Sequence, residues 1–413
     1  MLYETYEAGR ALSAPMFALA GAQAAALSRV PGPLASLPGV RAMRAASETL
    51  HALQITHERP AFGVDSVVVD GDVVPVAEQA VRSTAFATLQ RFAKEGATAQ
   101  PRVLVVPGLA GHFGTLVRAT VRTLLPEHDV YLVDWHNARD VPPGEGRFGL
   151  DEYIAHIVDF LLEMGPGTHV MAVCQPCVPV LAAAAVLAED QDPAQPQSLI
   201  LMAGPVDARL NPGPVNNFAG RVSHAVLDRT AIHTVPWPHR GAGRRVYPGF
   251  LQVMGFLGLD PRRHASAFRG LLRDVARGDE AAAQRTKSFY DEFFAVLDVP
   301  AEFYLDTLDV IFTEHHLARG CMTWRGRPVR PSAISSALLA IEAENDELCP
   351  PGQTRAAHDL CTSIPAERRR EHLQPGVGHY GVFNGSRFER EIYPVIREFI
   401  AGAATTATYR SRR

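Results

Sequence analysis

Cys174, Asp346 and His379 are the residues whose types and order best suit covalent catalysis in this chain. Cys174 ends a short apolar run at residues 169–173, Asp346 follows another apolar run, and His379 stands in the glycine-flanked stretch GVGHYG. A cysteine thiol has an unperturbed pKa of about 8.5, so it needs a base or an ion-pair partner to attack a carbonyl group near neutral pH. A histidine can be that partner, and a carboxylate can hold the imidazole in the required tautomer. The order nucleophile, acid, histidine predicts a triad.

The turn around Cys174 has the features of a nucleophile placed between a strand and a helix. It reads Ala172-Val173-Cys174-Gln175-Pro176, where a Gly-x-Ser-x-Gly motif would have serine at its centre. Ala172 is small enough for a tight turn, and a proline such as Pro176 is tolerated in the first turn of a helix. The N-terminus of that helix favours the thiolate over the thiol. These features indicate the strained strand-to-helix turn of an α/β-hydrolase.

The loop at residues 105–114, VVPGLAGHFG, is the expected second half of an oxyanion hole. Such a hole needs two N–H donors aimed at the oxygen on which negative charge develops. One is the backbone N–H of the residue after the nucleophile, here Gln175, and the other comes from a loop after an earlier strand. We expect the second donor to be Leu109, and we assign its neighbours Ala110 and His112 to substrate binding.

Each assignment has an alternative. Cys174 could be an inert buried cysteine, or it could form a redox pair with Cys177 in the stretch Cys-Gln-Pro-Cys. The five cysteines are few and odd in number, so we expect a reducing compartment and no disulfide framework. No Cys and His residues have the spacing of a structural zinc site and no glycine-rich phosphate loop is found, so we expect no metal and no cofactor. Other residues that could act as base or acid are His112, His372, Glu344 and Glu347.

The elements that must position these residues alternate between strands and helices. An Asp-Gly pair at residues 70–71 between apolar runs predicts a hairpin. The alternation that follows predicts an α/β fold with a mostly parallel, doubly wound sheet. Ligands and catalysis belong at the carboxyl ends of such strands, where Cys174 stands. The runs expected to be buried strands before the alternation breaks are residues 102–106, 128–135, 169–174 and 198–205.

The alternation stops at about residue 206 and resumes at about residue 333, which favours a helical cap or lid inserted into one core over two independent domains. Ahead of the core, acidic residues near the start and Gln23 argue against a signal peptide or a membrane span, so we expect an amphipathic helix. The expected units are an N-terminal helical segment packed on the core (1–60), the first part of the core (61–205), the cap (206–332), the second part of the core (333–403) and a tail (404–413).

Composition excludes several classes of function. The 413 residues are 47% hydrophobic and 20% charged, which is ordinary for a globular protein with a large core. A formal net charge of −4 gives no sign of a nucleic-acid partner. Without an expected signal peptide or transmembrane segment, we expect a cytoplasmic protein. A homodimer is compatible with the chain, although no pattern indicates one.

Seven stretches, in order and nearly from end to end, resemble the intracellular polyhydroxyalkanoate (polyhydroxybutyrate) depolymerases. They are MLYETYEAGRALSAP, VVPGLAGHFGTLVR, YLVDWHNARDVP, MAVCQPCVPVLAA, VPAEFYLDTLDVIFTEHHLARG, IEAENDELCPPGQT and GVGHYGVFNGSRF. That family has cysteine where lipases have serine, so the resemblance implies that Cys174, Asp346 and His379 are its triad. The chain is similar, more distantly, to the polyhydroxyalkanoate synthases. Those usually show Gly-x-Cys-x-Gly-Gly, which the residues after Cys174 do not fit, and this favours a depolymerase.

The resemblance implies hydrolysis of short-chain polyhydroxyalkanoate granules, or of hydroxybutyrate oligomers, by a granule-associated enzyme. Cys174 would attack an ester of poly(3-hydroxybutyrate) to give a thioester, and water activated by His379 would release 3-hydroxybutyrate and its oligomers. Because thiols attack thioesters readily, coenzyme A is a second candidate acceptor. Aromatic residues of the cap offer apolar surface for the polymer, and of these we assign Trp237 and Tyr247 to substrate binding. The alternatives are a synthase-like acyltransferase and a non-catalytic granule-associated protein.

Overall fold

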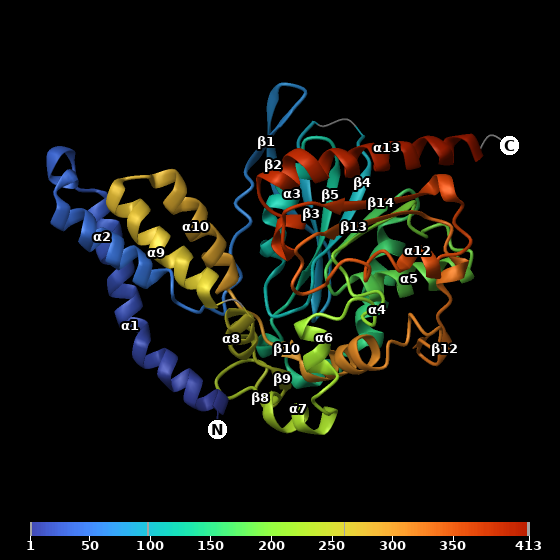
Figure 1. The fold of residues 1–413 in the computed structure, drawn as a ribbon, viewed down its shortest axis with the longest axis horizontal. Helices are drawn as coiled ribbons and strands as arrows, with labels where there is room; N and C mark the ends of the chain where they lie inside the picture. Colours follow the sequence, from blue (N-terminus) through green and yellow to red (C-terminus); the bar gives the residue numbers. More distant parts are fainter. Residues whose placement is uncertain (1, 97–98, 260, 411–413) are drawn as a thin grey trace.

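A nine-stranded sheet forms the body of the protein (Figure 1). The computed structural model describes residues 2–96, 99–259 and 261–410. For residues 259 and 404–410 it describes the backbone only. Strand order is β1-β2-β3-β5-β4-β6-β7-β13-β14, and the strands from β5 to β14 are mutually parallel, whereas β1, β2 and β3 pair antiparallel. The expected mostly parallel sheet is confirmed. The strands are β1 (Ser66–Val69), β2 (Asp72–Ser83), β3 (Ala87–Lys94), β4 (Arg102–Val106), β5 (Asp129–Trp135), β6 (His169–Val173), β7 (Ser198–Met202), β13 (Ala337–Ala343) and β14 (Arg369–Gln374).

Helices cover both faces of this sheet, as a doubly wound fold requires. Successive side chains of a strand point to opposite faces. Leu104 and Val106 of β4 accordingly belong to the core on the side of α4 (Leu150–Met164) and α5 (Cys177–Glu189). Val103 and Val105 belong to the core on the side of α3 (Arg118–Leu124) and α13 (Tyr393–Arg410). Because β4 is buried on both faces, its sequence is a continuous apolar run.

One long insertion separates β7 from β13. Its helices are α6 (Pro214–Ala219), α7 (His224–Thr230), α8 (Gly249–Leu259), α9 (Pro261–Arg277), α10 (Glu280–Phe293) and α11 (Ala301–Thr307). It also contains short strands that our purely helical expectation lacked: β8 (His233–Thr234), β9 (Arg245–Tyr247) and β10 (Val299–Pro300) form one small sheet, and β11 (Thr323–Trp324) pairs with β12 (Arg327–Pro328). After β13, the short helix α12 (Ala357–Leu360) precedes β14.

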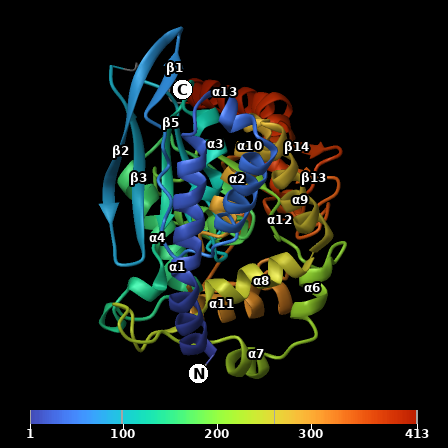
Figure 2. The same ribbon diagram turned by 90° about the vertical axis from the view of Figure 1, so that its left-hand side faces the viewer.

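The N-terminal helices pack chiefly on this insertion and not on the sheet. α1 (Leu2–Ser28) packs against α2 (Pro38–His51), α2 packs against α9, and α9 packs against α10. The four helices stand to one side of the sheet in Figure 1 and lie towards the viewer in Figure 2. Ala45 of α2 shares a buried cluster with Leu271 and Val275 of α9. This corrects the expectation that residues 1–60 pack on the core.

The end of the chain also differs from the expectation. α13 continues to Arg410, so residues 404–410 extend the last helix and are not a separate tail. The final part of the predicted tail, residues 411–413, lies outside the described residues.

Candidate active site

Cys174 sits on a strained turn at the end of β6. Its φ is 71°, in the left-handed region that residues other than glycine rarely adopt. The turn is held because the Cys174 N–H donates to the carbonyl of Met202 at 2.8 Å and the Cys174 carbonyl accepts the N–H of Cys177 at 3.1 Å. Gly204 allows this packing, because a Cβ there would collide with Cys177 and lie 2.8 Å from the Cys174 carbonyl oxygen. Sequence reasoning missed Gly204, whose only signal is that a glycine follows a buried strand.

The structure brings His379 and Asp346 together beside this turn. His379 Nδ1 lies 2.8 Å from Asp346 Oδ2 and 3.0 Å from Oδ1, and both side chains are buried. Asp346 Oδ1 also accepts the backbone N–H groups of Leu348 at 2.9 Å and Cys349 at 2.7 Å. Asp346 follows β13 and His379 follows β14, so the carboxyl ends of neighbouring parallel strands position the acid and the base.

The charges around His379 favour its protonated form. Burial alone would lower the pKa of this imidazole. The negative charges of the Cys174 thiolate and the Asp346 carboxylate, together with a hydrogen bond to each, outweigh burial and hold the pKa of His379 well above its usual value. The structure therefore places a histidine whose protonated form is favoured between the Cys174 sulfur and the Asp346 carboxyl group, an arrangement that can activate a cysteine nucleophile.

The two expected oxyanion-hole residues lie next to Cys174. Leu109 and Gln175 line the same cavity as Cys174. Within the described part of the chain, neither backbone N–H donates a hydrogen bond to another residue, so both are available to an oxyanion. The loop that carries Leu109 is anchored because the indole N–H of Trp135 donates to the Pro107 carbonyl at 3.1 Å and the Leu297 N–H donates to the Gly111 carbonyl at 2.9 Å.

A cavity of about 500 Å³ opens over Cys174 between the sheet and the insertion. None of the described residues that line it is charged. The core contributes Leu109, Ala110, Cys174 and Gln175 to its floor, as expected for Ala110. The aromatic residues of its walls are Phe218, Tyr247, Phe256, Phe303, Tyr304 and Phe312. Of these, sequence reasoning named Tyr247 as substrate-binding and missed Phe303, Tyr304 and Phe312, which read as the buried face of an ordinary amphipathic helix.

A smaller cavity of about 50 Å³ lies on the other side of Cys174, next to His379 and Tyr380. His112 lines this cavity and not the larger one, and it is buried. Burial lowers the pKa of His112 to about 4, despite hydrogen bonds with the backbone, so its ring is neutral at pH 7. His112 can thus contribute a neutral wall behind the nucleophile.

The structure does not place Trp237 in the site. Its side chain is 87% exposed in the loop between β8 and β9, and it lines neither cavity next to Cys174. Our assignment of Trp237 to substrate binding is therefore not supported by its position, because aromatic character alone does not tell which way a loop residue points.

The alternative residues are placed less favourably than the predicted ones. The Cys177 thiol is buried, contacts the Ala172 carbonyl at 3.5 Å, and has a pKa raised by burial. His372 bonds with Gln374 within β14 at 2.9 Å. Glu344 accepts the Gly376 N–H at 2.7 Å. The remaining alternative, Glu347, accepts the backbone N–H of His379 at 3.4 Å and not the ring.

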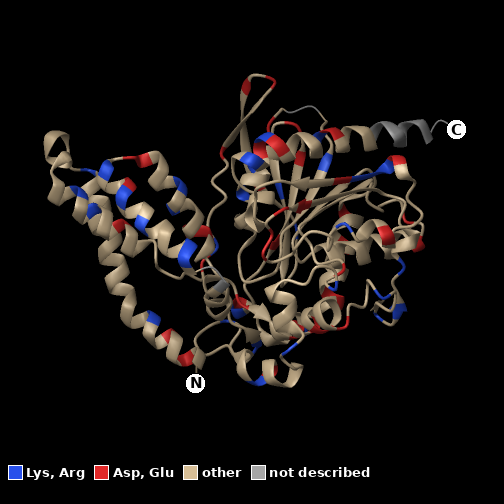
Figure 3. Ribbon diagram, in the orientation of Figure 1, with Lys and Arg blue, Asp and Glu red and all other residues tan. Residues whose placement is uncertain are grey.

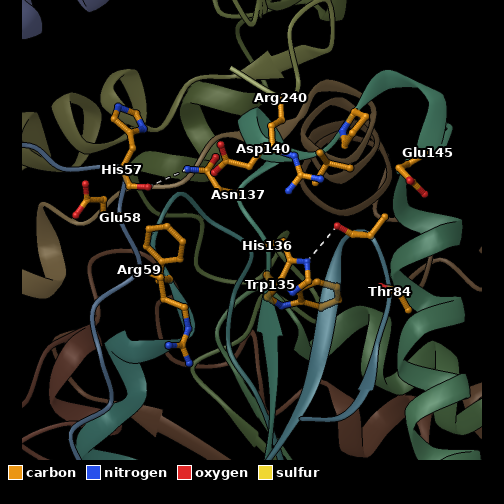
Figure 4. Close-up of a pocket in the computed structure, with 14 residues that line it drawn as sticks. His57, Glu58, Arg59, Thr84, Trp135, His136, Asn137, Asp140, Glu145 and Arg240 are labelled. Carbon is orange, nitrogen blue, oxygen red and sulfur yellow. Dashed lines mark hydrogen bonds between the residues drawn. The ribbon is translucent and has the colours of Figure 1, made fainter. Parts of the chain in front are cut away.

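A further pocket of about 590 Å³ is more polar and lies away from Cys174 (Figure 4). Its charged groups are partly neutralised within the protein, since Arg59 pairs with Asp134 at 2.6 Å. His136 is bonded through both ring nitrogens, to the Ala85 carbonyl at 3.1 Å and to Thr88 at 2.9 Å. None of the described residues that line this pocket is a cysteine, so it lacks the nucleophile that lies beside His379 at the other site.

Comparison with known families concerns the C-terminal half of the chain. Residues 203–404 match the family model described as PHB de-polymerase C-terminus. The resemblance seen in the sequence is confirmed there. The matched PHB depolymerase region contains the insertion, Asp346 and His379, whereas Cys174 lies ahead of it.

A curated relative is similar to a longer part of the chain. The poly(3-hydroxyalkanoate) polymerase subunit PhaC of Haloferax mediterranei is 24% identical over 306 residues, which cover 70% of this chain and 56% of that protein. The chain thus spans little more than half the length of this relative.

Solved structures of other proteins are also similar to this chain. A hydrolase from Pseudomonas aeruginosa PA01 has a TM-score of 0.46 at 15% identity, with 79% of this chain and 98% of that chain covered. The Paleococcus ferrophilus monoacylglycerol lipase has a TM-score of 0.44 at 16% identity, with 76% and 99% covered. The strand order and the turn at Cys174 identify the α/β-hydrolase fold in this chain.

Proposed function

We propose that this protein hydrolyses ester bonds of short-chain polyhydroxyalkanoates such as poly(3-hydroxybutyrate) through a Cys174–His379–Asp346 triad. The observation that carries the proposal is the buried pair of His379 and Asp346 beside Cys174, which itself lies at the floor of an apolar cavity. The PHB depolymerase family of residues 203–404 supplies the substrate class. We further propose that the protein acts at the surface of polyester granules in the cytoplasm.

In the first half-reaction, the Cys174 thiolate attacks the carbonyl carbon of an ester. The Leu109 and Gln175 N–H groups stabilise the oxyanion that forms. When the carbon–oxygen bond breaks, the leaving alkoxide takes the proton of the His379 imidazolium, and the acyl group remains on Cys174 as a thioester. Asp346 keeps the proton of His379 on Nδ1, so that Nε2 faces the reacting groups.

In the second half-reaction, neutral His379 takes a proton from water, and the resulting hydroxide attacks the thioester. The carbon–sulfur bond breaks, the thiolate of Cys174 returns, and His379 is again an imidazolium. The products are a hydroxyacid, or a shorter oligomer that ends in a carboxylic acid. The cycle is balanced without a metal ion or a redox group, which is consistent with the proposed lack of a cofactor.

The cavity suits an uncharged polyester chain. No charged side chain lines it among the described residues, so an aliphatic ester buries apolar surface there without leaving an unpaired charge. The same property bears on coenzyme A as an acceptor. The phosphate groups of coenzyme A would have to remain outside this cavity, and only its uncharged thiol arm could reach Cys174.

A synthase-like acyltransferase is the second candidate, because the curated relative is a polymerase subunit. Amorphous poly(3-hydroxybutyrate) particles, incubated with and without coenzyme A and followed by mass spectrometry of the products, separate the candidates. We expect free 3-hydroxybutyrate and oligomers from the wild type and none from Cys174→Ala. Hydroxybutyryl-CoA formed from polymer would show thiolysis. Net incorporation of added hydroxybutyryl-CoA into polymer would establish a synthase, and no product under any condition would leave a non-catalytic granule protein.

A further inference from the structure

The N-terminal helix α1 exposes an apolar face to solvent. Leu12, Met16 and Leu19 recur at helical spacing, so they share one face, and they are 83%, 48% and 70% exposed. Residues 11–28 contain no charged side chain, and α1 is tan in Figure 3 beyond its first turns. The helix is long and apolar enough to cross a membrane, yet only 11% of its most apolar stretch is buried. Exposed apolar surface of this extent marks a contact site.

This face is not the part of α1 that stabilises the fold. The buried residues of the helix are Tyr3, Ala20 and Ala24, and not the exposed Leu12, Met16 and Leu19. We call the face formed by Leu12, Met16 and Leu19 the N-terminal apolar surface. Other large apolar side chains that are exposed among residues 2–53 are Leu2, Leu34, Leu37, Met43 and Leu53.

The start of α1 is attached to the wall of the cavity at Cys174. Tyr6 stacks on Phe250 of α8 with a ring-centroid distance of 3.8 Å, and the Tyr3 hydroxyl donates to the buried carboxylate of Asp298. Gln252 and Phe256, on the same helix as Phe250, line the cavity. A surface bound along α1 is thereby held at a fixed position relative to the cavity.

We propose that the N-terminal apolar surface docks the protein on the surface of an aliphatic polyester particle. The inference rests on the proposed function, because it adds a binding surface for the same insoluble substrate. A polyester has no formal charges, so a charged side chain buried against it would lose its hydration without gaining a partner. An exposed face without charges avoids that cost, and its leucine and methionine side chains bury apolar area against the polymer.

A membrane fits these observations less well. Helices that lie on membranes carry Lys and Arg on their polar face. The single basic residue within α1, Arg10, instead pairs with Glu7 at 2.9 Å, and Glu7 pairs in turn with Arg139 of the core. Insertion across a bilayer would also have to release Tyr3 and Tyr6 from their contacts.

The test measures binding to particles in a Cys174→Ala background, where the polymer is not consumed. The probe is amorphous poly(3-hydroxybutyrate) particles of fixed size, and bound protein is separated by sedimentation. Leu12→Asp/Leu19→Asp should weaken binding at least tenfold. The control Leu162→Asp/Leu373→Asp changes two exposed leucines on α4 and β14, away from α1, and should change binding less than twofold. With an active Cys174, both variants should hydrolyse p-nitrophenyl butyrate within twofold of the wild type.

Three outcomes would overturn the inference. Equal particle binding by Leu12→Asp/Leu19→Asp and the wild type would show that α1 does not dock. Binding of neutral phosphatidylcholine vesicles as tightly as polyester would assign the surface to a membrane. A wild-type dimer that dissociates in the variant with unchanged particle binding would assign it to a second copy of the chain. If the two aspartates impair folding, the uncharged polar variant Leu12→Gln/Leu19→Gln replaces them in the same binding assay. Failure of the proposed function would give a different result: the wild-type protein would bind the particles but would not cleave their ester bonds.

Discussion

Replacement of Asp346 by asparagine tests the charge arrangement around His379. Asp346 Oδ1 accepts two backbone N–H groups, from Leu348 and Cys349, and Oδ2 faces His379 Nδ1 at 2.8 Å. An asparagine has only one oxygen, so either its NH₂ group faces the N–H of His379 or it faces the two backbone donors. In the first orientation the NH₂ group donates to Nδ1 of His379, so the neutral ring must carry its proton on Nε2. Nε2 can then no longer accept a proton from water.

The size of the effect follows from these contacts. Loss of a hydrogen bond between charged groups costs about 1.5–3 kcal/mol, and a buried donor left without an acceptor costs about 1–3 kcal/mol more. At about 1.36 kcal/mol per factor of ten, the value of kcat/KM should fall by roughly 10² to 10⁴. The carboxylate also helps to raise the pKa of His379, so its loss should lower that pKa. The imidazolium that protonates the leaving group would then be lost at lower pH, and the alkaline limb of the kcat/KM profile should move to lower pH.

The assay is hydrolysis of p-nitrophenyl butyrate between pH 5 and 10, with circular dichroism to confirm folding. Glu344→Gln is the matched control, because it makes the same chemical change at a neighbouring carboxylate that bonds with a backbone N–H and not with His379. It should retain activity and the pH profile. If Asp346→Asn keeps more than a tenth of the activity, or if Glu347→Gln shows the larger loss, Asp346 is not the acid of the triad.

Three further predictions concern the surroundings of the nucleophile. Cys177→Ala should keep most activity while Cys174→Ala abolishes it, measured with the same soluble ester; equal loss in both would restore the dithiol alternative. Gly204→Ala, which places a methyl group against Cys177, should destabilise the protein by about 1–3 kcal/mol in urea unfolding and lower kcat; full stability and activity would show that the turn is less tightly packed than described. Trp237→Ala should leave KM for hydroxybutyrate oligomers unchanged while Tyr247→Ala raises it, and the reverse result would reinstate Trp237 as a binding residue.

The strands and the positions of Cys174, Asp346 and His379 at strand ends could be predicted because their signals are local. A strand buried on both faces, such as β4, is a continuous apolar run. Its short length and the Pro-Gly pair that follows favour a strand over a buried helix. Parallel strands then place their carboxyl ends at one edge, so Cys174, Asp346 and His379 had to lie near one another once each was assigned to a strand end.

The arrangement of the helices could not be predicted in the same way. The apolar stripe of α2 shows that the helix has a buried face, but it does not show whether a sheet or α9 covers that face. The end of α13 was placed too early because its apolar period weakens after Ile400, whereas the helix continues to Arg410. The outward position of Trp237 depends on a loop path that no periodicity encodes.

Identification of the acylated residue tests the central claim most directly. Wild-type protein mixed rapidly with p-nitrophenyl 3-hydroxybutyrate, quenched in acid and digested, should yield one modified peptide by mass spectrometry. We predict a single 3-hydroxybutyryl group on Cys174, sensitive to hydroxylamine as a thioester is, and absent in Cys174→Ala. An acyl group on another residue, or turnover that continues in Cys174→Ala, would contradict the proposed covalent mechanism.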